Sequence, residues 1–163
     1  MRRFATALSL IALIGFPART AFAADGAVPA YSANAPVAFG ITIGDLHRAA
    51  ESGDDGAVPA DRPLIIDAEI GSVSILADTD DEFAAEVELV GGLWHGEDEV
   101  ELYRAYAIFE HPRFREFFSR RSATRLLPGD RILVLCRFLG IGVDYDEETP
   151  IAVVEAAELR RTQ

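Results

Sequence analysis

Five stretches between Leu64 and Leu159 have the residue pattern of β-strands, and one helical stretch separates the third from the fourth. The strand-like stretches are Leu64–Leu76, Phe83–Val90, Val100–Phe109, Arg131–Leu139 and Ile151–Leu159. They are rich in branched and aromatic residues, and turn-forming residues such as Gly96-Glu97-Asp98 separate them. This order predicts a sheet protein with one helix inserted after its third strand.

The first strand carries a glycine in its middle, and the second ends on two glycines. A glycine inside a strand often marks a bulge or a bend, so we expect Gly71 to curl the first strand. In Phe83–Val90 the apolar residues alternate with glutamates that would point outward. Gly91 and Gly92 are expected to break or bend that strand.

The fourth strand has apolar residues on both faces. Ile132, Val134 and Cys136 share one face of Arg131–Leu139, and Leu133 and Leu135 share the other. Gly140–Pro150 is expected to be a loop with a dense cluster of acids.

Two short helices are expected outside the strands. Thr42–Glu51 has Asp45 in its first turn and is followed by Gly53, which can end it. Pro112 fits the first turn of a second helix, whose three phenylalanines would face the core, namely Phe114, Phe117 and Phe118.

Five strands with a helix between the third and fourth are the arrangement of the OB-fold, a small, partly open Greek-key barrel. A central glycine in the first strand fits this fold, because that strand must curl to serve both sheets of the barrel. We therefore predict an all-β fold with minor α content. It is a five-stranded OB-like Greek-key barrel with a helix between strands 3 and 4 and a short N-terminal helix.

Several local patterns resemble those of a known family. They are the helix carrying Asp45-Leu46, the strand with Gly71, the Leu127-Pro128-Gly129-Asp130 turn and the strand ending in Phe138-Leu139-Gly140. In these, roughly from Thr42 to Arg160, the chain resembles exported bacterial OB-fold domains related to the tRNA-anticodon-binding-like family. The stretch from Val100 to Phe118 departs from that family by its aromatics and its Arg-rich helix. The resemblance implies a shape, and it does not imply tRNA binding, because an exported protein does not meet tRNA.

The N-terminus has the pattern of a secretory signal peptide. Arg2 and Arg3 precede an apolar stretch, and Ala21-Phe22-Ala23 supplies small residues for cleavage before Ala24. We expect residues 1–23 to be a signal peptide, 24–41 a flexible segment and 42–163 the barrel domain. The protein would then be periplasmic or secreted, with no transmembrane segment after cleavage.

The chain is acidic, with a formal net charge of −12, and its basic residues are all arginines. Cleavage after Ala23 would remove Arg2, Arg3 and Arg19 and leave a net charge of −15. Binding to nucleic acid draws on positive charge, so this balance argues against nucleic acid as a partner. The absence of Lys excludes lysine nucleophiles and Schiff bases.

No familiar catalytic or metal-binding motif occurs in the sequence. Cys136 lies between apolar neighbours and is either a nucleophile paired with a histidine or, as we favour, a buried core thiol. The three histidines, His47, His95 and His111, lack the spacing of metal ligands. Acidic turns at 78–82 and 144–148 are interpreted as solvated turns rather than calcium loops. We predict no catalytic residues, no metal and no cofactor.

Charge is distributed unevenly along the chain. The segment 112–131 holds six arginines against two acids, whereas 78–101 holds ten acids and no arginine. These regions could neutralise each other, which we favour, or the arginines could recruit an anionic ligand or an acidic protein. The residues expected to line such a site are Tyr103, Arg113, Arg115, Arg120 and Arg121.

The function expected from the sequence is an exported, non-enzymatic binding or interaction module of the cell envelope, with no ligand specified. One alternative is an enzyme or binder that acts on an anionic small molecule at the Arg-rich helix. A second alternative is a structural envelope protein that associates with itself.

Overall fold

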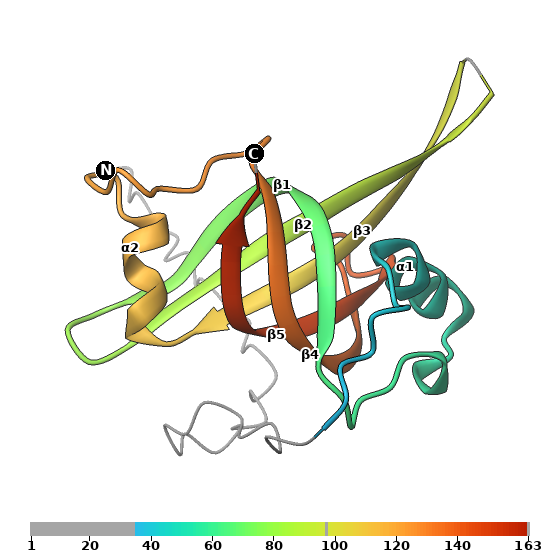
Figure 1. Ribbon diagram of the computed structural model, residues 1–163, viewed down its shortest axis with the longest axis horizontal. Coiled ribbons are helices and arrows are strands. Elements are labelled where there is room, and N and C mark those ends of the chain that lie inside the picture. Colours follow the sequence, from blue (N-terminus) through green and yellow to red (C-terminus); the bar gives the residue numbers. More distant parts are fainter. Residues whose placement is uncertain (1–34, 97, 163) are drawn as a thin grey trace, which may run out of the picture.

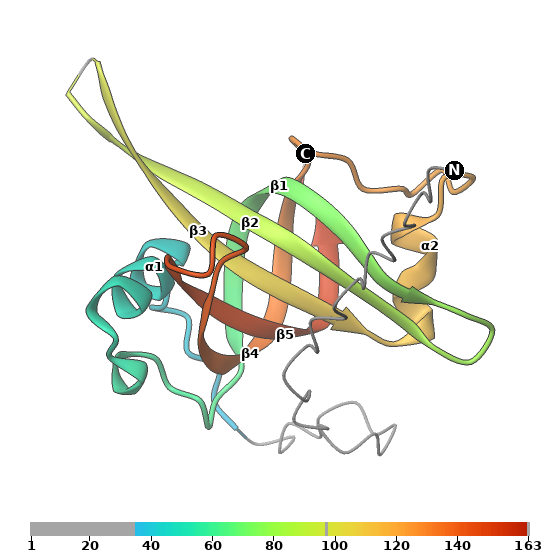
Figure 2. The same cartoon turned by 180° about the vertical axis from the view of Figure 1, so that it is seen from behind.

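A computed structural model describes residues 35–96 and 98–162, and the barrel in it is built from five strands. The strands are β1 (Leu64–Asp78), β2 (Phe83–His95), β3 (Glu99–Glu110), β4 (Arg131–Val143) and β5 (Pro150–Arg161). The helices are α1 (Ile43–Ser52) and α2 (Arg115–Phe118), with short 3₁₀ turns at Asp55–Ala57 and Pro112–Phe114. Figures 1 and 2 show α1 and α2 at opposite ends of the barrel.

The strands close into a barrel in the order β1-β2-β3-β5-β4 (Figure 1). Strands β3 and β5 run parallel where they close the barrel, and the other neighbours are antiparallel. The helical insertion lies between β3 and β4. This topology confirms the predicted five-stranded OB-like barrel.

Strand β1 serves two neighbours by bending at its glycine. Its first half pairs with β4 from Leu64 to Glu69, and its second half pairs with β2 from Glu69 to Asp78. The register with β2 shifts between Ile70 and Ser72, so Gly71 forms the predicted bulge. A Cβ atom on Gly71 would lie 2.6 Å from Cγ2 of Val90, so the close approach of β2 requires glycine there.

Helix α1 begins and ends as the sequence indicates. The Thr42 hydroxyl accepts from the Asp45 backbone N–H, and the Asp45 carboxylate accepts from the Thr42 N–H at 2.8 Å, which together form a capping box. Gly53 ends the helix in the left-handed region at φ 66°. The helix packs against one end of the barrel, where Leu46 is fully buried.

Strand β2 continues through its two glycines, so of the two expectations for them, a break or a bend, the break is wrong. It continues through Gly91 and Gly92 to His95 and remains paired with β3 throughout. A Cβ atom on Gly91 would lie 2.5 Å from Cγ2 of Ile43, so this glycine lets α1 approach the strand. The hairpin of β2 and β3 therefore projects beyond the barrel as a long ribbon (Figure 2).

Strand β4 is also longer than predicted. The residues from Gly140 to Val143 continue the strand and pair with β5 as far as Pro150. Gly140, with φ 137°, lies at a register shift between β4 and β5 and forms a bulge there. The strand continues past this bulge, where it was expected to end. The loop between β4 and β5 is therefore residues 144–149.

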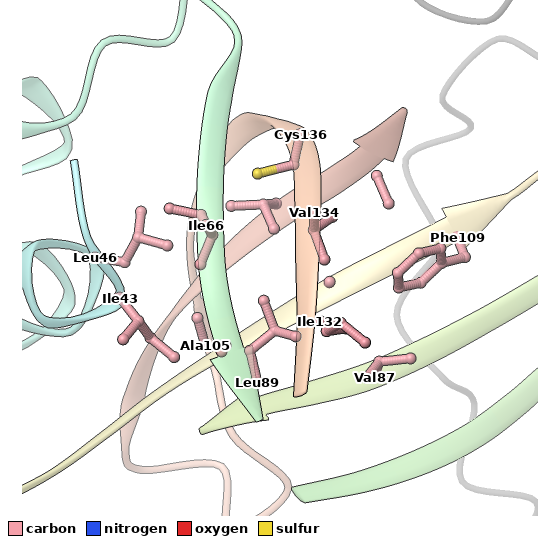
Figure 3. Packing of buried hydrophobic residues seen from close by; sticks show 14 of the residues in the cluster. Ile43, Leu46, Ile66, Val87, Leu89, Ala105, Phe109, Ile132, Val134 and Cys136 are labelled. Atoms are coloured by element: carbon pink, nitrogen blue, oxygen red, sulfur yellow. The ribbon is translucent and has the colours of Figure 1, made fainter. Parts of the chain in front are cut away.

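The core fills the barrel, as Figure 3 shows. It also includes buried residues of both helices, such as Leu46 of α1 and Phe118 of α2. Ile66, Val87, Leu89, Val134 and Cys136 are fully buried inside the barrel. Near α2, the ring of Phe109 lies edge-on to Phe114 and Phe118, with centroids 5.1 and 5.4 Å apart. Phe117 is half-buried against the same cluster, so this short helical insertion covers one end of the core.

The predicted signal peptide lies outside the described residues, and the boundary between a flexible segment and the domain stays a prediction. Within the described chain, Ala38 forms a parallel bridge to Leu64, and Ile41 packs against the core. No helix in residues 35–96 and 98–162 is long and apolar enough to cross a membrane.

Candidate binding face

Three of the six arginines of the 112–131 segment, Arg113, Arg115 and Arg131, form side-chain hydrogen bonds or ion pairs within the described part of the molecule. Arg115 donates to the Asp78 carboxylate at 2.8 Å and to the Glu82 carbonyl at 3.1 Å. Arg113 donates to the Ala157 carbonyl and lies 3.4 Å from Glu158. The ion pairs with Asp78 and Glu158 favour the interpretation that the protein's own acids neutralise part of this segment.

Arg120 and Arg121 lie in the exposed loop after α2, beside a shallow depression of about 560 Å³. Its lining residues are Pro112, Arg113, Arg115, Glu116, Ser119, Arg121 and Ser122. The structure therefore brings Arg113, Arg115 and Arg121 together, but two of these three already have internal partners.

Tyr103 lies at the other end of the barrel, away from the arginines with which the sequence grouped it. Its ring is buried beneath α1, where a Cβ atom on Gly44 would lie 3.0 Å from it. Its hydroxyl donates to Glu101 at 2.9 Å, and Glu101 also accepts from His95 at 2.9 Å. We therefore correct the expected grouping of Tyr103 with the arginines, because the alternation of β3 points this side chain into the core beneath α1.

In the 144–149 loop, Asp146 is held by local hydrogen bonds. Asp146 accepts from the hydroxyl of Thr149 at 2.6 Å and from two backbone N–H groups, and these bonds lower its pKa to about 2. In the described residues, no group of three or more His, Cys, Asp or Glu side chains is placed to hold a metal ion.

Cys136 is fully buried inside the barrel and points into the core (Figure 3). Burial raises the pKa of its thiol to about 12, so the thiol is protonated at neutral pH. Of the two interpretations left open by the sequence, the structure favours the packed core thiol.

A polar and aromatic cluster covers the outer face of the β2–β3 hairpin where it crosses the barrel. Arg104 on β3 donates to Glu88 on β2 at 2.5 Å and to Asp144 in the 144–149 loop at 2.8 Å. The Tyr106 hydroxyl donates to the same Asp144 at 2.6 Å. These bonds fix the loop over the hairpin. We call this the outer-face cluster: Glu86, Glu88, Arg104, Tyr106, Asp144 and Tyr145.

Tyr145 is the exposed member of the outer-face cluster, with 72% of its surface accessible. Its hydroxyl donates to Glu86, and its ring lies edge-on to Tyr106 at a centroid distance of 5.9 Å. An exposed aromatic ring held by a hydrogen bond at its tip is a fixed surface against which a flat ligand can stack.

Burial and hydrogen bonds determine the protonation of Tyr106 and Asp144 in the outer-face cluster. Burial, together with Asp144, raises the pKa of Tyr106 well above its usual range. The hydrogen bond from Tyr106 lowers the pKa of Asp144, and Arg104 lowers it further. Tyr106 therefore stays neutral and Asp144 stays charged around neutral pH.

The sequence-based predictions did not include this cluster, although the strand pattern of the hairpin indicates part of it. The register of β2 with β3 places Tyr106 opposite Glu88 on the outward side. What the sequence did not supply is the contact of Asp144 and Tyr145, which lie 38 or more residues along the chain from their partners in β3 and β2.

No protein-family model matches the sequence, and no curated protein matches it. Among solved structures, the chain is similar to a Plasmodium falciparum SSB in complex with ssDNA, with 11% identity and a TM-score of 0.45. That match covers 62% of this chain and 94% of the other. It is also similar to Rim1, a mitochondrial single-stranded DNA-binding protein of S. cerevisiae, with 9% identity and a TM-score of 0.42, covering 62% and 93%.

These neighbours overturn one prediction and leave another untested. Both are named as single-stranded DNA-binding proteins, and this finding contradicts the prediction that nucleic acid is an unlikely partner. The OB-fold part of the resemblance is confirmed, whereas the relation to the tRNA-anticodon-binding-like family stays a prediction.

Proposed function

We propose that this protein is an exported, non-enzymatic binding module whose ligand lies across the outer face of the β2–β3 hairpin, beside the 144–149 loop. In OB-folds, the second and third strands and the loop between the last two strands bind oligonucleotides and oligosaccharides. The outer-face cluster occupies that location here. The observation that carries the proposal is Tyr145, exposed yet held by Glu86 at the edge of this surface.

The chemistry of the cluster suits binding better than catalysis. A general acid or base works best with a pKa near the working pH. The pKa values of Tyr106 and Asp144 are both shifted away from neutral pH, upward for the phenol and downward for the carboxyl. These groups therefore orient a ligand and the loop, and they do not exchange protons with a substrate at neutral pH.

The ligand class suited to this face is a polymer whose units contain rings, namely an oligonucleotide or an oligosaccharide. Tyr145 offers a stacking surface, and Arg104 and Glu88 offer a donor and an acceptor held in place by their mutual hydrogen bond. Nucleobases and sugar rings both stack on aromatic side chains and hydrogen-bond at their edges. One oligonucleotide and one oligosaccharide are therefore the probes for this surface.

The test is a titration of the purified protein with fluorescent oligothymidine and with an N-acetylglucosamine oligomer. Loss of one stacking contact costs about 1–3 kcal/mol, so Tyr145→Ala should weaken binding by roughly five- to 150-fold. Tyr145→Phe keeps the ring but loses its hydrogen bond to Glu86, so its affinity should lie between those of the unmodified protein and Tyr145→Ala. Phe39→Ala removes an equally exposed aromatic outside the cluster and serves as the matched control.

The outcomes separate the parts of the proposal. Weakened binding of either probe by Tyr145→Ala but not by Phe39→Ala supports this face, and the probe that binds gives the ligand class. Equal binding by Tyr145→Ala and the unmodified protein would show that the ligand lies elsewhere. Absence of binding by both probes would contradict a ring-polymer ligand.

A second candidate is a site for an anionic small molecule, and the depression beside Arg121 is the observation that favours it. Arg113 and Arg115 are poor test positions because their internal contacts hold the insertion to the barrel. Arg120→Ala combined with Arg121→Ala leaves those contacts intact. If inorganic phosphate raises the melting temperature of the unmodified protein, this double variant should lose that increase.

Export is the remaining part of the proposal, and its support is the sequence pattern of residues 1–23. Expression of the full chain in a Gram-negative host should yield periplasmic protein whose N-terminus is Ala24. Full-length protein confined to the cytoplasm would contradict it.

A further inference from the structure

The second half of β1 has an edge with no neighbouring strand. Its first half pairs with β4, and the turn before β4 extends that pairing to Ile70, whose N–H donates to the Asp130 carbonyl at 2.9 Å. Beyond Ile70 the strand pairs only with β2. Within the described part of the chain, no backbone hydrogen bond joins the opposite edge of residues 72–77 to another segment. We call this the free edge of β1.

Other exposed backbone groups near α2 are covered by arginine side chains. Arg113 donates to the Ala157 carbonyl of β5, beyond the end of the pairing of β5 with β3. Arg115 donates to the carbonyls of Thr79 and Glu82 in the turn between β1 and β2. No side-chain hydrogen bond of the described residues reaches the backbone of the free edge. The free edge is therefore open, whereas backbone groups on either side of it have partners.

The sequence of the free edge lacks most of the features that protect edge strands. It reads Ser-Val-Ser-Ile-Leu-Ala, with no charged residue and no proline. Natural sheets protect such edges with charged side chains, prolines or bulges. Only the bulges are present here, at Gly71 and Leu76, where the register with β2 shifts. They limit the regular part of the edge to residues 72–75, which suits a short peptide and disfavours long pairing between copies of the chain.

From this we infer that the free edge of β1 is a docking site for an extended peptide of a partner protein, which joins the sheet as a strand antiparallel to β1. The edge of a strand presents alternating backbone donors and acceptors, and an extended backbone matches them along its length. Ile75 and Leu76 are 48% and 46% exposed and would contact apolar side chains of the peptide. The proposed ligand of the outer-face cluster lies over β2 and β3, so the peptide is an additional partner.

Charge defines the composition of this peptide. The turn at 78–82 carries four acids, and Arg115 pairs with one of them, Asp78. The other three form no ion pair among the described residues. A peptide antiparallel to β1 has its N-terminal end beside this turn, because β1 leads into the turn at its own C-terminal end. The partner segment should therefore carry basic residues followed by an apolar, β-branched stretch.

The probe is a fluorescein-labelled peptide in which two lysines precede an alternating run of valine and threonine. Binding is measured by fluorescence anisotropy, and the backbone of residues 72–77 is followed by amide hydrogen exchange. In the free protein, the amides that face the free edge should exchange rapidly, because they have no partner. Saturating peptide should slow their exchange about tenfold or more, because they then donate to the peptide backbone.

Two N-methylated versions of the peptide test whether it binds as a strand. Successive residues of a strand direct their N–H groups to opposite edges. A version methylated along one edge can still present the other edge to β1 and should retain most of its affinity. A version with the same number of methyl groups divided between both edges should bind about tenfold or more weakly, because each edge has lost hydrogen bonds. Equal affinities of the two versions would show that the peptide is not bound as a strand.

Two protein variants test the charge. Asp80→Asn combined with Asp81→Asn should weaken peptide binding by about two- to thirtyfold, the effect of losing two exposed ion pairs. Asp55→Asn combined with Asp61→Asn makes the same change of net charge in the exposed loop after α1 and should leave the affinity unchanged. Equal weakening by both double variants would show that only the overall charge attracts the peptide.

Two further results overturn the proposal. Failure of the peptide to bind at millimolar concentration would show that the free edge does not accept a strand. Slow exchange of residues 72–77 in the free protein, together with a dimer in analytical ultracentrifugation, would assign the edge to a second copy of the chain. Neither result bears on the outer-face cluster, whose ligand is tested with separate probes.

Discussion

The bulge at Gly71 offers a direct test of how the barrel closes. In Gly71→Ala, the new methyl group would lie 2.6 Å from Cγ2 of Val90 and 2.9 Å from Oε2 of Glu88. Glu88 can move its carboxylate away, but a valine methyl can move only with its strand or by a change of the χ1 rotamer, which β-branching restricts. Overpacking of this kind costs about 1–3 kcal/mol. The loss of glycine flexibility in the unfolded chain offsets about 0.4–1 kcal/mol. We expect a net loss of about 1–2 kcal/mol.

The measurement is urea unfolding at constant m-value, with two controls that the same fold supplies. Gly142→Ala places a methyl group 3.4 Å from Cγ2 of Val153, an ordinary contact, so its stability should be unchanged or slightly raised. In a Val90→Ala background, Gly71→Ala should cost at least about 0.5 kcal/mol less, because the obstructing methyl is gone. Equal stabilities for Gly71→Ala and Gly142→Ala would refute the reasoning.

The same substitution reports on the candidate binding face. The Glu88 carboxylate lies close to the position of the new methyl and also holds Arg104. Gly71→Ala should therefore weaken ligand binding as well as the fold, whereas Gly142→Ala should change neither. Lost stability with unchanged binding would show that Arg104 is held well enough by Asp144 alone.

The remaining predictions concern the core thiol and the 144–149 loop. Cys136→Ser should cost about 1–3 kcal/mol in urea unfolding, because it buries a hydroxyl without a partner in an apolar site. Cys136 in the native protein should resist thiol reagents at pH 8 and react on unfolding, because burial raises its pKa to about 12. Asp146 should titrate near pH 2 by NMR. Because the pKa of its carboxyl is depressed in the fold, its contribution to stability is present above pH 3.8 and is lost as pH falls toward 2. Asp146→Asn should abolish that acid-dependent loss.

Sequence reasoning succeeded where a local rule and the fold require the same residue. Helix α1 begins at the capping box of Thr42 and Asp45 and ends at Gly53, as capping rules indicate. Gly71 also behaves as expected, because a strand shared between two neighbours must bend and few residues other than glycine fit at the bend. At such positions, the residue type contains enough information to place the element.

The sequence-based predictions were wrong where a glycine is required by a contact with a residue distant in sequence. Gly91 has the pattern of a strand end, yet it lies within β2 because Ile43 of α1 packs on it. Tyr103 was grouped with the arginines by proximity in sequence. The alternation of β3 sends it toward α1, whereas Tyr106, three residues later, faces outward to Asp144. Which face a residue occupies depends on strand register, and which loop meets that face depends on barrel closure.

The placement of charge in this barrel shows why the binding face could not be located from the most basic stretch of the sequence. Two arginines of the 112–131 segment, Arg113 and Arg115, hold the insertion to the barrel. Arg104, which has no basic neighbour in sequence, is instead the arginine of the outer-face cluster, where Glu88 and Asp144 fix its position. Strand register places Arg104 on the outward side of the hairpin, and closure of the barrel brings Asp144 to it. The arginine that serves the candidate binding face is therefore determined by register and by the 144–149 loop, and not by the local density of positive charge along the chain.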